Sequence, residues 1–180
     1  MKWMLVLACL AMGTTAMGSS EKSGTSARNV QIVKAWAEAL ERGDRIGAEQ
    51  FLSEDTRNFG RTVGREGYRR VWDDIYTTFP DWKMEIVDLV ATGDSVILRA
   101  QVSATHRGVG RLPINGGLLV GVQPTGRHFE VQHIHWFKLR DGRITDHYAT
   151  RDDIGMMQQL GLLPEVGRPD VKPQAEVQAR

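Results

Sequence analysis

Hydrophobic side chains recur at every third or fourth position through much of the first half of the chain, as on one face of an amphipathic helix. This spacing predicts helices over 27–42 and 46–52. It also predicts a third helix that carries Tyr68 and Trp72 and ends before Pro80, because proline cannot continue a helix. Three helices are therefore expected before the middle of the chain.

In the second half, hydrophobic and polar side chains alternate with a period of two, as in half-buried strands. Turn signals at Thr92-Gly93-Asp94 and Asp141-Gly142 predict hairpins. Helices followed by long antiparallel strands indicate an α+β domain, with helices packed on one side of a curved sheet. With a brief strand near 56–59, the expected strands cover 82–91, 95–106, 133–139 and 143–150.

Composition and charge narrow the class of protein. A chain of 180 residues with 41% hydrophobic and 25% charged residues suits one domain, expected over 27–163. The net charge of +1 argues against nucleic acid as a partner, because nucleic-acid binding needs clustered basic residues. No dinucleotide fingerprint, P-loop or Gly-x-Ser-x-Gly elbow is present. We therefore expect chemistry from side chains alone, with no cofactor.

The N-terminus is typical of a Sec signal peptide. Lys2 is followed by an apolar run over 3–12 and by small residues up to Ala16, where cleavage would release an exported protein. The run is too short to span a bilayer, so no membrane anchor is expected in the mature form. A lipoprotein anchor at Cys9 and a cytoplasmic start at Met17 are the alternatives.

Two flanking segments are expected to lack a packed core. Residues 17–26 are rich in glycine and serine, which predicts a flexible leader. Residues 164–180 turn polar after Pro164 and include Pro169 and Pro173, which predicts a disordered tail.

The richest chemistry lies between His133 and Gly161. The period of a strand places His133 and His135 on one face, and the return strand brings His147 and Tyr148 back on opposite faces. Asp152 and Asp153 then precede a short amphipathic helix over 154–160, which Gly161 can end as its C-cap.

This arrangement resembles the SnoaL-like polyketide cyclases, also called ester cyclases, of the nuclear-transport-factor-two-like superfamily. The resemblance rests on the Asp-Gly-Arg-Ile turn, the acidic-His-aromatic strand after it, and the Asp-Asp-x-Gly-Met helix that ends in Gln-Leu-Gly. It extends more loosely over 27–163. It implies a cone-shaped fold with helices over the concave face, a homodimer, and no metal. The implied activity is a cofactor-free, intramolecular aldol-type cyclisation, or a related proton transfer, on a small hydrophobic carbonyl or ester compound.

The resemblance assigns the base to Asp152, which would remove a proton α to a carbonyl. Burial would suit this role by raising the pKa of the carboxyl. Asp152 is also placed to cap the following helix, a structural role that would leave it no part in the chemistry. Asp153 competes for either role.

The histidines are candidates for the acid. His135, with Tyr148 or His133, would donate a hydrogen bond to the developing enolate oxygen. The pair His133 and His135 with His147 also resembles half of a metal site, and simple packing of each ring is the third alternative.

Further residues are candidates for ligand binding. His106 and Arg127 border the irregular, glycine-rich segment 107–126, which could cover the mouth of a cone, and either could orient a carboxylate or ester. Arg127 next to Gly126 could instead be a turn residue. A competing function is a non-catalytic cone that binds a small apolar ligand. Aromatic side chains that could line a pocket, or only fill the core, are Trp36, Trp72, Tyr76 and Trp82.

Overall fold

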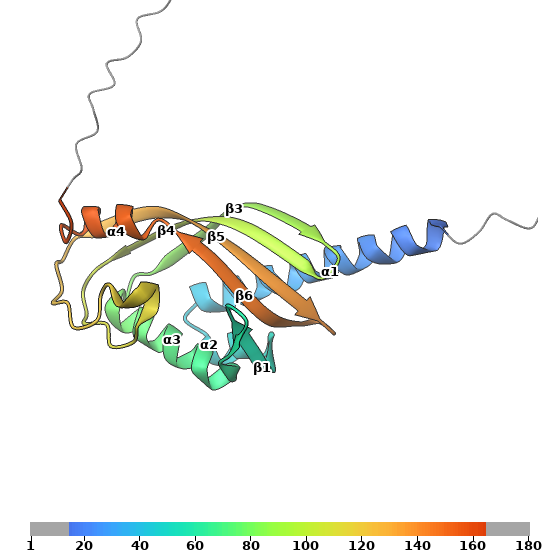
Figure 1. Cartoon of the computed structure of the whole chain (residues 1–180), viewed down its shortest axis with the longest axis horizontal. Helices are drawn as coiled ribbons and strands as arrows, with labels where there is room; N and C mark the ends of the chain where they lie inside the picture. Colours follow the sequence, from blue (N-terminus) through green and yellow to red (C-terminus); the bar gives the residue numbers. More distant parts are fainter. Residues whose placement is uncertain (1–14, 165–180) are drawn as a thin grey trace, which may run out of the picture.

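A single six-stranded sheet with helices on one side organises the protein in our computed structural model, which describes residues 15–164 (Figure 1). The strand order is β2-β1-β6-β5-β4-β3. The helices are α1 (Thr15–Glu41), α2 (Arg45–Glu49), α3 (Gly64–Thr78) and α4 (Asp153–Gln159), with a 3-10 turn at Ile114–Gly117. The strands are β1 (Leu52–Asn58), β2 (Arg61–Thr62), β3 (Lys83–Thr92), β4 (Ser95–Thr105), β5 (His128–Arg140) and β6 (Arg143–Arg151).

The long strands β3 to β6 curve over α1, α2 and α3, which confirms the predicted α+β class (Figure 1). Neighbouring strands are antiparallel except β1 and β6, which pair in parallel. The sheet is therefore mixed rather than wholly antiparallel. Parallel pairing needs a long connection, and here most of the domain lies between the two strands.

The first helix differs from its predicted extent. It begins at Thr15 rather than at 27, so residues 17–26, expected as a flexible leader, are helical in the structure. This stretch contains no proline, so the helical hydrogen-bond ladder can continue through it. Residues 1–14, with most of the predicted signal peptide, and 165–180, with nearly all of the predicted tail, lie outside the described residues. Within 15–164, no helix is long and apolar enough to cross a membrane.

The hairpin between β5 and β6 turns where the sequence predicts. Asp141 and Gly142 have φ values of +52° and +74°, the left-handed conformation of a two-residue hairpin turn. Pairing through the turn sets the strand register, with Phe137 opposite His147 and His135 opposite Ala149. The turn thereby decides which side chains of β6 share a face with those of β5.

The core lies between the concave face of the sheet and the helices. Trp36 of α1 is 2% exposed and packs edge-on against Phe137 of β5, with ring centroids 5.0 Å apart. Trp72 of α3 lies 6.0 Å from Trp36 and 6.2 Å from Trp82. These aromatic rings tie α1 and α3 to the sheet, and they border the polar groups described next.

Candidate active site under the sheet

The concave face of β5 carries two buried histidines among apolar side chains. Side chains from Phe129 to Leu139 are buried at odd positions and mostly exposed at even ones, so the predicted alternation is confirmed. His133 is 3% exposed and His135 is 8% exposed, and their ring centroids are 5.5 Å apart. The strand thus buries two titratable rings.

Strand β6 adds a third histidine and an arginine to the same face. His147 lies opposite Phe137, Ala149 opposite His135, and Arg151 opposite His133. Residues directly opposite each other in an antiparallel pair project to the same face, so His147 and Arg151 point to the concave side.

Tyr148 therefore points to the convex side, away from the predicted site. It lies opposite Trp136, 5.6 Å between ring centroids, and its hydroxyl donates to Asp146 Oδ2 at 3.1 Å. The prediction that Tyr148 assists His135 is not supported by this placement. The period of the strand correctly predicts that Tyr148 and His147 lie on opposite faces, but it does not say which of the two faces is buried.

Two of the three histidine rings, His135 and His147, are hydrogen-bonded and stacked, and His133 packs at a tilt beside His135. His135 Nδ1 lies 2.9 Å from His147 Nε2, and the planes of these rings are nearly parallel, at 16° to each other. His147 Nδ1 lies 3.2 Å from Asn58 Oδ1 of β1, where parallel pairing brings Asn58 beside His147. A continuous polar chain thus runs under β5, β6 and β1.

Burial keeps these histidines neutral. Loss of solvation, together with the nearby His135 and Arg151, lowers the pKa of His133 to about 3. Loss of solvation and the positive charge of Arg151 lower the pKa of His135 to about 4. The pKa of His147 is also lowered, first by burial and then by His135 and Arg151. All three rings are uncharged at neutral pH.

The two aspartates after β6 have different roles in the structure. Asp152 is exposed and caps α4, where its Oδ1 accepts a hydrogen bond from Gly155 N at 2.8 Å. Gly155 allows this approach, because a side chain there would collide with the Asp152 carboxylate. Asp152 therefore has the geometry of a helix cap, which was the structural alternative, and it does not have the geometry of an enclosed base.

Asp153 is the aspartate that turns toward the site. Its side chain is 28% exposed and its Oδ1 lies 3.8 Å from Arg151 Nε. Burial raises the pKa of the Asp153 carboxyl, although Arg151 opposes the shift. A carboxylate with a raised pKa beside an arginine is suited to accepting a proton.

Several buried polar atoms in this region have no hydrogen-bond partner. Buried polar groups are paired in the great majority of cases, so unpaired ones in one place point to a ligand that the protein is built to bind. Arg151 Nε and Trp82 Nε1 are donors, and Asp153 Oδ1 is an acceptor. The atoms in this polar cluster are Trp82 Nε1, His133 Nδ1, His135 Nε2, Arg151 Nε and Asp153 Oδ1.

The remaining aromatic candidates are mainly core residues. Trp36 and Trp72 pack against each other and against neighbouring rings, and the Tyr76 hydroxyl donates to the backbone oxygen of Leu40. Trp82 alone combines packing with an unpaired polar atom, and its ring lies 6.1 Å from that of His133. Trp82 is thus the aromatic residue that borders the polar cluster.

His106 and Arg127 make contacts within the protein at the two ends of the segment 107–126, rather than contacts that orient a ligand. His106 is fully buried, and its Nδ1 accepts from Thr125 N at 3.3 Å. The backbone N of His106 donates to the oxygen of Arg127 at 3.0 Å, and the Arg127 guanidinium lies against Gly161 at the end of α4. This arrangement fits the alternative that Arg127 is a turn residue.

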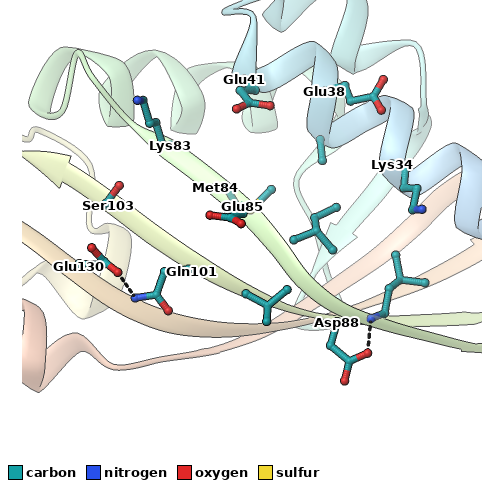
Figure 2. A pocket seen from close by; sticks show the side chains of 14 residues that line it. Lys34, Glu38, Glu41, Lys83, Met84, Glu85, Asp88, Gln101, Ser103 and Glu130 are labelled. Carbon is teal, nitrogen blue, oxygen red and sulfur yellow. Dashed lines mark hydrogen bonds between the residues drawn. The ribbon is translucent and has the colours of Figure 1, made fainter.

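A second region, a surface groove between α1 and the edge strand β3, is separate from the polar cluster (Figure 2). It encloses about 740 Å³, but none of the three histidines, Arg151 or Asp153 lines it. Its labelled charged groups, such as Glu38, Lys83 and Glu85, are exposed. Solvated charges need no ligand, so the polar cluster is the better candidate site.

Within residues 15–164, histidine, cysteine and acidic side chains form no group of three or more able to hold a metal ion. Two residues of the site, Arg151 and Asn58, were not foreseen from the sequence. Counting through the hairpin from His133 would have placed Arg151 beside it, because opposite residues share a face. Asn58 had no such signal, since its position depends on a parallel pairing between distant strands.

Comparison with known proteins agrees with this fold. The family model described as SnoaL-like polyketide cyclase matches residues 30–160. Nogalonic acid methyl ester cyclase of Streptomyces nogalater is 30% identical over 112 residues, which cover 62% of this chain and 77% of that protein.

Solved structures show the same fold. TsrD of Streptomyces laurentii is 30% identical with a TM-score of 0.64, over 76% of this chain and 97% of that one. IdmH of Streptomyces antibioticus, described as a "putative polyketide cyclase", is 29% identical with a TM-score of 0.60, over 74% of this chain and 98% of that one. The matched residues include the whole hairpin and all of α4, so the family match covers the site. The chain belongs to the SnoaL-like polyketide cyclase family.

Proposed function

We propose that this protein is a cyclase that catalyses a cofactor-free, intramolecular aldol-type ring closure, or a related proton transfer, on a small hydrophobic carbonyl or ester compound. The observation that carries the proposal is the cluster of buried, unpaired polar atoms under β5 and β6. It holds both donors and acceptors in an apolar surrounding, which a reaction that moves a proton and develops a negative oxygen requires.

Within this proposal, Asp153 replaces Asp152 as the base. Asp152 caps the helix, whereas Asp153 has a buried oxygen that accepts no hydrogen bond, and the pKa of its carboxyl is raised. The Arg151 guanidinium, which always carries its protons, would stabilise the enolate oxygen through its unpaired Nε–H. Apolar rings, such as those of Trp82 and Phe137, would hold the carbon skeleton.

The related cyclases support the substrate class. The names of the relatives specify a methyl ester of nogalonic acid in one case and of aklanonic acid in another, and both proteins are cyclases. We infer that a polyketide-like ester or ketone is the substrate class here too. The homodimer and the exported location remain predictions.

A ligand screen tests the proposal. We would measure thermal shift and turnover for wild type, Asp153→Asn and the matched control Asp152→Asn against aromatic and polycyclic ketones and esters. A compound that stabilises all three proteins, but is converted only by wild type and Asp152→Asn, would support the proposal. Binding without conversion by any of them would favour a non-catalytic binding protein.

A further inference from the structure

A chain of three side chains, Asn58, His147 and His135, joins three strands under the sheet. Its two contacts are 3.2 Å from Asn58 Oδ1 to His147 Nδ1 and 2.9 Å from His147 Nε2 to His135 Nδ1. Both contacts are within hydrogen-bonding distance, so a proton lies in each. The positions of these protons decide what the last ring can offer a ligand.

The proton positions follow from what each group can donate. An amide oxygen only accepts, so the Asn58 oxygen requires the proton of His147 on Nδ1. The half-buried His147 ring is neutral, because loss of solvation lowers its pKa, and it has one proton, so its Nε2 can only accept. His135 must therefore donate from Nδ1, which leaves a lone pair on its Nε2.

The free nitrogen of His135 is a buried acceptor without a donor. His135 is 8% exposed, and its Nε2 has no partner. Leaving a buried acceptor unpaired costs free energy, so a donor group of a ligand would be selected strongly at this point. The unpaired Nε–H of Arg151 is a donor and would select an acceptor instead.

We propose that Asn58 and His147 lock His135 in the tautomer with its proton on Nδ1, so that His135 Nε2 accepts a hydrogen bond from a hydroxyl or enol group of the substrate. Asn58 and His147 are positioning residues, and His135 determines specificity for a hydroxylated carbonyl compound. The ligand part rests on the proposed function, whereas the tautomer does not. This inference reverses the earlier expectation that His135 donates to the enolate oxygen, and it leaves that role to Arg151.

Nitrogen NMR tests the tautomer without any ligand. Long-range ¹H–¹⁵N correlation on the full chain, labelled with ¹⁵N-histidine and assigned with His135→Leu and His147→Gln, distinguishes protonated from unprotonated ring nitrogens. We expect the proton of His135 on Nδ1 in wild type and in Asn58→Asp, which keeps the accepting oxygen. Asn58→Leu should give a mixture of tautomers, and the neighbouring Arg57→Leu should change nothing.

A proton on His135 Nε2 in wild type would overturn the assignment, because it would mean that the Asn58 amide nitrogen faces His147 and that the chain runs in reverse. An unchanged His135 tautomer in Asn58→Leu would also overturn it, since Asn58 would then be only structural. Circular dichroism of each variant shows whether it is folded.

Two matched probes test the ligand part, namely 6-hydroxy-1-tetralone and its methyl ether, 6-methoxy-1-tetralone. We expect the phenol to bind wild type about tenfold more tightly, and the difference to disappear in His135→Leu. Equal affinity for wild type would overturn the acceptor role of His135 in ligand selection. If neither probe binds, the substrate class of the proposed function fails, while the tautomer result still decides the hydrogen-bond chain independently.

Discussion

The two faces of the β5–β6 hairpin differ in whether their polar side chains have hydrogen-bond partners. On the convex face, the Tyr148 hydroxyl is paired with Asp146, and Lys138 Nζ is paired with Asp94 and Ser95. On the concave face, where an unpaired group costs more, His133 Nδ1 and Arg151 Nε have no hydrogen-bond partner. If only stability mattered, the unpaired polar groups would lie on the convex face and the paired ones on the concave face. The difference therefore indicates that the concave face is kept polar for a ligand.

The largest expected effect is the loss of turnover on substitution of a residue of the concave face. Arg151→Gln removes the cation proposed to stabilise the enolate oxygen, and should lower turnover by about 10²- to 10³-fold. Tyr148→Phe, its control on the convex face, should leave turnover unchanged. Steady-state rates on a compound from the ligand screen check both. Equal losses in the two variants would show that the faces do not differ in function.

A pH series tests the neutral histidines. Their pKa values are lowered in the folded state, so they stabilise the protein fully above the unfolded value of about 6.5 and less as pH falls from there toward about 4 and 3. Because His147 shifts in the same direction, we expect the free energy of unfolding to fall by about 2–4 kcal/mol between pH 7 and 5.5. Urea denaturation at each pH measures it.

The raised pKa of Asp153 changes the free energy of unfolding with pH in the opposite direction to the histidines. It costs stability at neutral pH, and this cost is relieved as the pH falls through the folded value. Asp153→Asn should therefore make the loss of stability on acidification steeper at pH values just above the ordinary aspartate pKa of about 3.9. A flat stability profile from pH 7 to 5.5 would contradict the buried, neutral state of the histidines.

The helix cap predicts a smaller effect. Asp152→Ala removes the acceptor for Gly155 N and should lower the free energy of unfolding by about 0.5–2 kcal/mol. Asp152→Asn should cost less, because asparagine also caps helices. Chemical denaturation checks the pair. A large loss of turnover in Asp152→Asn with unchanged stability would return Asp152 to the role of base.

The smallest effect is expected on the convex face. Trp136 is 41% exposed, and Trp136→Thr should change the free energy of unfolding by no more than about 0.5 kcal/mol. The same denaturation measurement checks it. A larger loss, growing with protein concentration, would show that this face is buried in an oligomer.

The fold could be predicted from the sequence because its signals are local. Strand alternation and the Asp141-Gly142 turn placed β5, β6 and the hairpin, and the Asp152 cap with Gly161 placed α4. The start of α1 was missed, because glycine and serine weaken a helix signal without ending a helix.

The site was predicted only in part. His133 and His135 were identified, because a single strand fixes their common face. Tyr148 was placed in the site and Asp153 was ranked below Asp152, because parity along one strand does not say which face is buried. Asn58 depended on β1 pairing in parallel with β6, a contact between residues 89 positions apart in the chain.

The central claim is that proton transfer occurs on the concave face. Hydrogen–deuterium exchange at a bound ketone is its most direct test. We would follow by NMR the exchange of the α-protons of α-tetralone in D₂O with wild type, Asp153→Asn and Asp152→Asn. The account predicts exchange catalysed by wild type and Asp152→Asn, and a rate about 10²- to 10⁴-fold lower with Asp153→Asn. Equal exchange with Asp153→Asn and wild type, or loss with Asp152→Asn alone, would contradict it.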